Sequence, residues 1–351
     1  MFGVIVNPVS GGREAAGLAV QITERIAALG EESRIFETGG DGDAAAQTRA
    51  ALAAGCQSIV CIGGDGTICE VAGELCHTGV TFYVVPGGTG NDFARAFHLP
   101  KNPMAAFEAQ LAGEPVEIDC GWMNGQSFLN VSGSGFDVAV LQKTEELKAV
   151  YPGEKAYRKA VLSVLGRYKA FEADVSIDGG AETHEACTIV EIANGQSIGG
   201  GMRVAPDAKL DDGYFDVVVV KKVPRMLIPL LLPAFMLGWH TKIGLARVVR
   251  AKNVTMRAKG MIVNLDGKLL RVDEAKYKIL PGAIRMKKPR AYNFSKTGLK
   301  RRVPSFSRQK GTQKEREHDE KTLVRMDRPC AAAERGMRPW RKPVRGQSGD
   351  G

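Results

Sequence analysis

The sequence lacks the features that would place the protein in a membrane or in an oxidising compartment. Its longest apolar run, residues 226–238, is short and interrupted by prolines, which excludes a membrane-spanning helix. No basic region followed by a long apolar core is present at the start, so we expect no secretory signal. The seven cysteines are odd in number, and none has the spacing of a zinc site or of C-x-x-C. These absences predict a cytoplasmic protein.

Acidic and apolar residues are scarce at the end of the chain. From Lys287 onward there are 19 Lys or Arg and 7 Asp or Glu, whereas residues 1–286 contain 29 and 32. Such a segment buries too little apolar surface to fold, so we interpret residues 287–351 as a disordered basic tail. It is either a solvated extension or an electrostatic contact for an anionic membrane or a nucleic acid. We expect no specific nucleic-acid partner.

The length of 351 residues predicts about two domains. At first, strand-like runs alternate with segments of helical period, which is the pattern of a parallel α/β sheet. Later, short β-branched segments punctuated by glycine predict a mainly antiparallel β domain, with helical character at 137–171 and 225–240. We therefore expect an α/β domain over residues 1–120, which residues 281–290 are a candidate to complete. The β domain is expected over residues 121–286.

Three glycine-rich loops, each after a predicted strand, carry the strongest chemical signal. They are NPVSGG at 7–12, GGDGT at 63–67 and PGGTGND at 86–92. Open α/β sheets bind ligands at the carboxyl ends of their strands, so the loops are expected to meet at one edge. Glycine lets several backbone N–H groups approach a phosphate, and a helix N-terminus behind the loop adds to the attraction. One such loop alone is usually an ordinary turn, whereas three together favour a triphosphate site.

Polar side chains in these loops add donors and a ligand for a cation. Thr67 and Thr89 can donate hydroxyl hydrogens. Asn7 and Asn91 can donate amide hydrogens. Asp65 can reach a magnesium ion or a water on it. Because no G-K-[ST] follows the loops, neither Walker A nor G-x-G-x-x-G is present in its full context, and the predicted nucleotide site is of another kind.

The three loops, in this order and spacing, resemble the diacylglycerol kinase catalytic family, which includes soluble bacterial lipid kinases. The similarity continues through NVSGSGFDVAV, ANGQSIGGGMRVAPDAKLDDGYFDVVVV and NLDG, and so covers residues 1–286. It implies ATP-dependent phosphorylation of a lipid hydroxyl in a cleft between two domains. The first is an α/β nucleotide-binding domain like those of phosphofructokinases and NAD kinases, and the second is a mainly antiparallel β-sandwich. PGGTGNDFAR and the later motifs favour the lipid branch of this larger group.

The resemblance also implies which residues bind ATP. They are Asn7, Pro8, Ser10, Gly11, Thr38, Gly63, Gly64, Asp65, Gly66, Thr67, Glu70, Gly88, Thr89, Asn91 and Asp92. Cys69 departs from the asparagine that is common in the family. A cradle made mainly of backbone groups should tolerate this change.

The stretch APDAKLDDGYFDV has two interpretations. Adjacent Asp211 and Asp212 before a glycine favour a loop that binds a hard cation, and the alternative is a polar β-hairpin turn. The resemblance implies that Asp212 and the backbone carbonyls of Lys209 and Tyr214 hold a structural Mg²⁺. It further implies that Asp211 joins Asp65 in a water network toward a catalytic Mg²⁺.

The expected catalytic base is where the chain departs from the family. The family motif is Asp-Gly-Glu, with the glutamate as the proposed base, but this chain has Asp266, Gly267 and Lys268. A protonated lysine cannot accept a proton, although it can hold the γ-phosphate as a point charge. Four hypotheses stay open: Asp266 is the base, burial deprotonates Lys268, Asp273 or Glu274 substitutes, or the chain is weakly active or inactive.

The apolar segment 226–238 also has two interpretations. It is either core of the β domain or a lip that exposes Leu230, Leu231, Leu232 and Phe235 to acyl chains or a membrane. His240, just behind it, is expected to be structural.

The leading hypothesis is an ATP- and Mg²⁺-dependent kinase that converts diacylglycerol to phosphatidic acid and attaches peripherally to a membrane. The alternatives are a kinase for another lipid alcohol, such as a sphingoid base, and a non-catalytic nucleotide- and lipid-binding regulator. A homodimer is compatible with the sequence.

Overall fold

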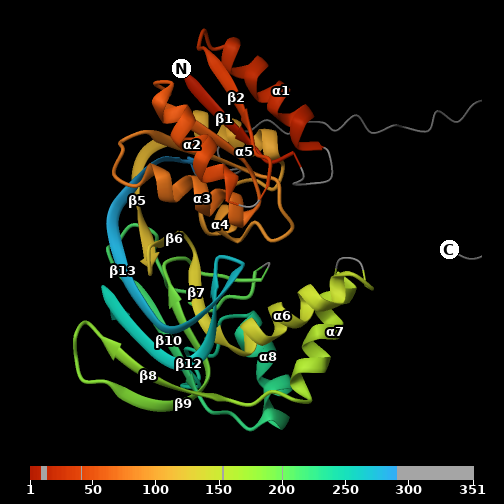
Figure 1. The fold of residues 1–351 in the computed structure, drawn as a ribbon, viewed down its shortest axis with the longest axis vertical. Coiled ribbons are helices and arrows are strands. Elements are labelled where there is room, and N and C mark those ends of the chain that lie inside the picture. The colour runs from red at the N-terminus through yellow and green to blue at the C-terminus, as the bar shows by residue number, and fades with distance from the viewer. Residues whose placement is uncertain (9–13, 41, 152–153, 200, 291–351) are drawn as a thin grey trace, which may run out of the picture. The chain divides into compact units, whose positions relative to one another are not determined.

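A computed structural model gives the structure of most of the chain (Figure 1). The described residues are 1–8, 14–40, 42–151, 154–199 and 201–290. All of these residues belong to one compact unit. The predicted tail from 291 onward lies outside the described residues, so its disorder stays a prediction. Among the described residues, no helix combines the length and the apolar content needed to cross a bilayer.

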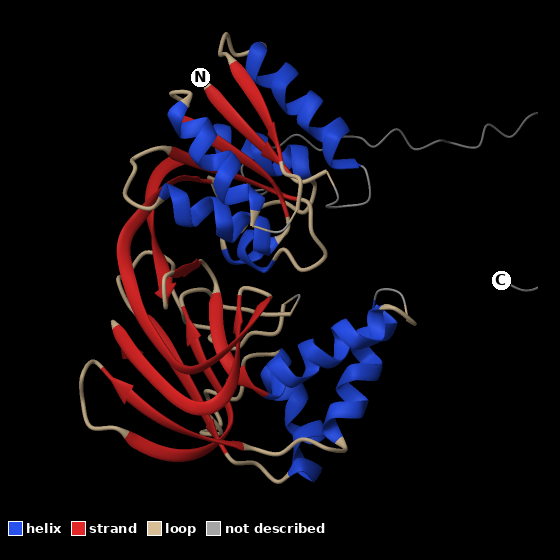
Figure 2. Ribbon diagram, viewed as in Figure 1, coloured by secondary structure: helices blue, strands red, loops and turns tan. Residues whose placement is uncertain are grey.

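The N-terminal part is the expected parallel α/β sheet. Its strands are β1 (Phe2–Val6), β2 (Ser33–Glu37), β3 (Ser58–Gly63) and β4 (Thr81–Pro86), in the order β2-β1-β3-β4. Its helices are α1 (Glu14–Ala27), α2 (Asp43–Ala53), α3 (Asp65–Leu75), α4 (Asp92–Ala96) and α5 (Pro103–Leu111). Helices α2 and α3 cover one face and α1 and α5 the other (Figure 2). The central strands are therefore continuous apolar runs, as parallel strands buried on both faces should be.

The second part is mainly antiparallel, as predicted. Its strands are β5 (Glu114–Met123), β6 (Gln126–Phe128), β7 (Val131–Gly135), β8 (Phe171–Ile177), β9 (Thr183–Ala193), β10 (Phe215–Lys221), β11 (Arg247–Ala251), β12 (Asn253–Leu265) and β13 (Lys268–Lys288). Neighbours in this part pair antiparallel, in the order β11-β10-β9-β7-β12-β13. An apolar core lies against these strands, with the rings of Phe128 and Phe215 stacked at 5.5 Å between centroids.

Two predicted helical segments are each divided. The segment 137–171 contains α6 (Phe136–Lys148) and α7 (Glu154–Leu165), and β8 begins at Phe171. The segment 225–240 contains a short 3-10 helix, η1 (Arg225–Leu227), followed by α8 (Ile228–Met236). Pro233 lies inside α8, and Gly238 with φ of 73° follows its end, which explains why this helix is short.

Strand β13 joins the two parts. It pairs antiparallel with β12 and β5, and then Arg285 and Met286 pair parallel with the start of β4. Its register against β5 shifts between Leu280 and Ile284, where Gly282 has a φ of 58°. The end of the chain thus adds a strand to the N-terminal sheet, while the domain boundaries at 120 and 286 stay predictions.

Candidate active site

The three glycine-rich loops lie at adjacent strand ends, where they were expected to meet. Asn7 follows β1, and its Nδ2 donates to Thr67 Oγ1 at the start of α3, at 3.3 Å. The backbones of the second and third loops are nearly in contact, because a Cβ on Gly88 would lie 2.6 Å from the Gly64 Cα. Only glycine allows this approach. Pro8 lies in the turn after β1, and Ser10 and Gly11 lie outside the described residues.

Gly66, in the first turn of α3, has open space on its outer side. Nothing lies within 4 Å of the position that a Cβ would take, and its φ is not positive. The fold therefore has no need of glycine here, although glycine in a helix is less stable than alanine by about 1 kcal/mol. Backbone N–H groups at a helix N-terminus attract anions, so the open space is suited to a phosphate.

Asp65, the first residue of α3, reaches across to the third loop. Its Oδ1 accepts a hydrogen bond from the Phe93 N–H at 3.2 Å, and its Oδ2 lies close to Gly90. Burial raises the pKa of Asp65, while the backbone N–H groups of Phe93, Asp92 and Asn91 act in the opposite direction. The carboxylate is therefore fixed between two loops and only partly solvated.

The third loop is held in shape by its own side chains. Asn91 has a φ of 50°, and its Oδ1 accepts from Gly88 N at 2.9 Å while its Nδ2 donates to Gly88 O at 2.7 Å. Asp92 is buried and forms an ion pair with Arg95 at 2.9 Å. Thr89, which lies between Gly88 and Asn91 in the chain, is exposed. Asn91 and Asp92 thus shape the loop, and their direct contact with ATP stays a prediction.

Two further predicted ATP residues differ in what they contact. Thr38 follows β2, and its buried hydroxyl is without a hydrogen-bond partner among the described residues. An unsatisfied buried hydroxyl is rare and marks a place that a ligand or water can complete. Glu70 instead accepts from Gly42 N at 3.0 Å, so it holds the loop that follows β2.

Asp266 and Gly267 form the two-residue turn between β12 and β13. Their φ angles of 48° and 100° are both positive, as a type I′ hairpin turn requires. The Asp266 carboxylate accepts three consecutive backbone N–H groups, those of Leu129 at 2.6 Å, Asn130 at 3.0 Å and Val131 at 2.8 Å. Burial raises the pKa of Asp266 to about 6, against the effect of these three donors. Because its oxygens fix the turn, the structure does not support the hypothesis that Asp266 is the base.

Cys69 links this turn to the helix that carries Asp65. Its Sγ lies 3.4 Å from Asp266 Oδ2 and 3.2 Å from the Ser127 carbonyl oxygen. Ser127 Oγ donates in return to the Cys69 carbonyl at 3.0 Å. Burial raises the pKa of the Cys69 thiol well above its ordinary value, so the sulfur keeps its proton and donates it. The position that departs from the family therefore connects the second loop to the β12–β13 turn.

The turn gives a testable pH dependence. Because the pKa of Asp266 in the folded protein, about 6, lies above that of an unfolded aspartate, its contribution to stability is present at low pH and is lost as pH rises to 6. Between pH 4 and pH 7, the free energy of unfolding of the wild type is expected to fall by up to about 3 kcal/mol relative to that of Asp266→Asn. Urea unfolding at several pH values would measure it. Asp273→Asn is a surface control that should keep the wild-type slope, and a parallel slope for Asp266→Asn would contradict the prediction.

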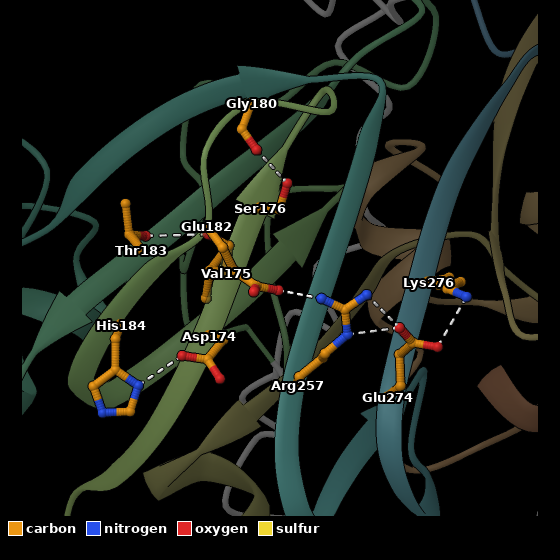
Figure 3. A network of polar contacts seen from close by, with 10 residues as sticks. All are labelled: Asp174, Val175, Ser176, Gly180, Glu182, Thr183, His184, Arg257, Glu274 and Lys276. Carbon is orange, nitrogen blue, oxygen red and sulfur yellow. Dashed lines mark hydrogen bonds and ion pairs between the residues drawn. The ribbon is translucent and has the colours of Figure 1, made fainter.

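None of the remaining candidates combines a position at the turn with an ability to accept a proton. Lys268 is exposed, so the hypothesis that burial deprotonates it has no structural support. Glu274 is bound by Arg257 at 2.7 Å and by Lys276 at 2.9 Å, so two cations hold its carboxylate (Figure 3). Asp273 is exposed and accepts from a backbone N–H of β12 at 2.6 Å. Both acids follow the turn by at least five residues, or about 16 Å of strand, so neither can replace the glutamate.

The predicted structural metal loop contains a competing cation. Asp212 Oδ2 forms an ion pair with Arg250 at 2.6 Å, and its Oδ1 accepts from Tyr214 N at 3.2 Å. The Arg250 guanidinium also stacks on the Tyr214 ring at 4.3 Å. Among the described residues, no group of three or more His, Cys, Asp or Glu could hold a metal ion. Arg250 would therefore compete with a cation for Asp212, and the Mg²⁺ site made by Asp212 with the backbone carbonyls of Lys209 and Tyr214 stays a prediction.

Asp211 and Lys209 face a different space. They line a cavity of about 230 Å³ together with residues after α4 and on β5. Asp211 is exposed, and within the described part of the chain no hydrogen bond joins it to Asp65. The water network between these two carboxylates stays a prediction.

Asp119, on β5, is a site residue that sequence reasoning missed. Its Oδ1 accepts from Gly282 N at 2.8 Å, and its Oδ2 accepts from Gly213 N at 2.7 Å. It therefore holds both the β13 bulge and the loop after Asp211 and Asp212. Burial raises the pKa of Asp119, and the nearby Asp212 and Asp211 raise it further. The available signal was an acid placed between apolar residues in the strand sequence IDCGW, 118–122.

Sequence reasoning also missed a buried pair of acids, Asp137 on α6 and Glu191 on β9. Burial raises the pKa of both, and that of Glu191 is raised well above its ordinary value, with Asp137 as the second cause. Glu191 is fully buried, and a Cβ on Gly133 would lie 2.2 Å from its Oε2. Two such carboxyl groups are most stable when they share a proton.

The fold and the converging loops define a two-domain kinase in which an α/β domain is followed by an NAD-kinase-like β domain. Residues 1–123 match the diacylglycerol kinase catalytic domain, and residues 130–288 match the YegS C-terminal NAD kinase beta sandwich-like domain. The chain is 30% identical over 293 residues to a diacylglycerol kinase of Mycobacterium tuberculosis, covering 82% of this chain and 94% of that protein. It belongs to the diacylglycerol kinase family of the soluble bacterial type.

Further relatives agree with this assignment. A diacylglycerol kinase of Staphylococcus epidermidis is 30% identical over 268 residues, covering 75% of this chain and 84% of that protein. A Bacillus anthracis protein whose crystal structure was solved as a candidate diacylglycerol kinase superposes with a TM-score of 0.68. It is 26% identical and covers 82% of this chain and 94% of that one. The chain therefore belongs to a family of lipid kinases, for which ATP is the implied phosphoryl donor.

Proposed function

We propose that the protein is a diacylglycerol kinase, which transfers the γ-phosphoryl group of ATP to the free hydroxyl of diacylglycerol and produces phosphatidic acid. The observation that carries this proposal is the close approach of the Gly64 and Gly88 backbones, with open space outside Gly66 and the Asp65 carboxylate fixed beside them. The named activity of the similar bacterial proteins supports the choice of lipid. The substrate lies in a bilayer, so we also propose a cytoplasmic protein that attaches peripherally to membranes.

The chain's own residues would mainly position the donor. Backbone N–H groups of the glycine loops bind the phosphates, and the unsatisfied Thr38 hydroxyl is available to a ligand. Asp65 is the carboxylate placed to hold Mg²⁺ or its water, and a bound Mg²⁺ would neutralise charge on the phosphates. Phosphoryl transfer depends on such positioning more than on covalent chemistry. With Lys268 at the base position, we expect the transfer to be slow.

A panel of lipid alcohols tests this proposal. Purified full-length protein would be incubated with ATP, Mg²⁺ and, separately, diacylglycerol, monoacylglycerol and sphingosine in mixed micelles. We expect phosphatidic acid as the main product. Phosphorylation of sphingosine alone would overturn the choice of substrate, and an absence of any phosphorylated lipid would favour the non-catalytic regulator that the exposed Lys268 makes the second candidate.

Gly66 and Gly73 provide a matched test of the phosphate cradle. Gly66→Ala is expected to stabilise the fold by about 0.5–1 kcal/mol, because it replaces a helical glycine in open space, and to raise KM for ATP about tenfold. Gly73→Ala, in the same helix, should destabilise the fold, because its Cβ would meet Ser127 Oγ at 2.5 Å. It should leave KM for ATP unchanged, because Gly73 lies away from the loops. Thermal unfolding without nucleotide and KM for ATP are the two measurements. An unchanged KM in Gly66→Ala would remove Gly66 from the ATP site.

A further inference from the structure

Large apolar side chains are exposed in and around α8. They are 46–84% exposed and belong to Met226, Leu227, Leu230, Met236, Leu237, Trp239 and Ile243, and we refer to them together as the 226–243 surface. Single exposed apolar residues are ordinary, but seven within 18 residues of chain mark an interaction site. The apolar segment 226–238 is therefore partly core and partly an exposed lip. Phe235 is buried, Leu231 and Leu232 are half-buried, and Leu230 is exposed.

The segment is firmly held on its inner side. Ile228 and Phe235 are buried, and the Phe235 ring stacks on the buried His240 with 4.1 Å between centroids. His240 Nε2 lies 2.8 Å from the Val204 carbonyl oxygen, which confirms its structural role. Leu230 lies on the helix face opposite Ile228. A helix that is apolar on all sides is normally buried, so the outer face of α8 requires an apolar partner.

Charge around this surface indicates which apolar partner it has. Residues 221–247, which include and flank this surface in the chain, contain five Lys or Arg and no Asp or Glu. Lys222, Arg225 and Lys242 are exposed, and the described part of the chain offers them no ion pair. Lys221 and Arg247 both approach Glu185, a largely buried acid on β9, at 3.7 Å. An apolar surface bordered by unpaired cations is complementary to a bilayer that contains anionic lipids.

We propose that the 226–243 surface docks the protein onto anionic phospholipid bilayers. The exposed side chains enter the boundary between headgroups and acyl chains, with Trp239 at the interface, as tryptophan prefers. The neighbouring cations contact the phosphate groups. The purpose of docking, which is to bring the active site to a lipid substrate, rests on the proposed function. Docking itself requires no catalysis.

Trp239 reports docking directly. Full-length protein would be mixed with phosphatidylcholine vesicles with and without about 30% phosphatidylglycerol, which supplies the anionic surface. We expect a blue shift of the fluorescence and quenching by brominated acyl chains, both strong with anionic vesicles and weak with neutral ones. Both signals should be absent from Trp239→Phe, which separates this residue from the two other tryptophans of the chain. Quenching that persists in Trp239→Phe would overturn the assignment.

Vesicle sedimentation with charge-introducing variants locates the surface. Leu230→Glu should weaken vesicle binding at least about tenfold, because it withdraws one leucine from the bilayer. Leu29→Glu, at an exposed leucine just after α1, is the matched control and should bind as wild type. Lys242→Gln should weaken binding to anionic vesicles roughly fivefold and leave the weak binding to neutral vesicles unchanged.

Three outcomes would count against docking. Wild-type binding by Leu230→Glu would place the bilayer contact elsewhere. A wild-type dimer without lipid that Leu230→Glu dissociates would show that a second copy covers this surface. If deletion of residues 291–351 abolishes vesicle binding while Leu230→Glu binds as wild type, the bilayer contact would belong to the basic tail. None of these measurements uses catalysis, so a protein that phosphorylates no lipid would fail the proposed function and leave this test intact.

Discussion

Asp65→Asn is expected to lower kcat for lipid phosphorylation by about 10²–10³-fold while leaving the protein at least as stable as wild type. The two effects have opposite origins in one carboxylate. Its negative charge is needed to hold the cation beside the phosphates, whereas burial raises its pKa and so makes the ionised form costly in the folded protein. A neutral amide of the same shape removes the charge and relieves that cost.

Steady-state kinetics and urea unfolding at pH 7 check this prediction together. Asp43→Asn is the matched control, because Asp43 is also the first residue of a helix, α2, and its Oδ2 accepts from Gly39 N at 2.6 Å. This control should lose stability through the weakened turn and keep its kcat. Should Asp65→Asn lose activity only in proportion to stability, Asp65 would be a structural residue.

Lys268→Glu is expected to raise kcat by about 100-fold, within the range of a general base. Lys268 is the first residue of β13, directly after a turn that the Asp266 carboxylate fixes to three backbone N–H groups. The position is therefore rigid, and its side chain is exposed. A glutamate there restores a proton acceptor that none of the described neighbours supplies. The activity gained should disappear below about pH 5, where the new carboxylate is protonated.

Two controls separate a restored base from a change of charge. Lys268→Gln removes the ammonium group without adding a base and should leave kcat near the wild-type value. Lys278→Glu makes the same charge change at an exposed position of the same strand, ten residues along. A fall in kcat for both Lys268→Glu and Lys268→Gln would show that the lysine itself steadies the phosphate, and the enzyme would then use a different route for the proton.

Local patterns predicted most of what surrounds the nucleotide loops. The strands before GGDGT and PGGTGND are continuous apolar runs, and parallel topology then brings their carboxyl ends to one edge. Gly30, a glycine just after α1, has a φ of 78°, and its N–H donates to the Ala27 carbonyl, as is common at the end of a helix. These features depend on residues that are near one another in the chain, so the sequence contains them.

Features that depend on distant residues were not predictable in the same way. The sequence left Asp266 as a candidate base, because the contacts that fix its carboxylate could not be foreseen. They join it to Leu129, Asn130 and Val131, about 135 residues away in the chain. The ion pair of Arg250 with Asp212 was hidden for the same reason.

Strand continuity was equally difficult to predict. Strand β13 continues through the dipeptide Pro281-Gly282 as a bulge, although proline and glycine usually interrupt a strand. Asp119, far away in sequence, accepts the Gly282 N–H and so stabilises the irregular backbone. Only the folded chain shows which partner meets such a group.

The buried pair of Asp137 and Glu191 restricts how this part of the chain can evolve. A glutamate at 191 occupies the volume in which any side chain at 133 would have to lie. The backbone carbonyl oxygen of Val190 would also lie 2.3 Å from a Cβ at 133, so a shorter residue 191 would not by itself make room for a side chain there. Position 133 is therefore restricted to glycine by a backbone atom as well as by Glu191, whichever residue stands at 191.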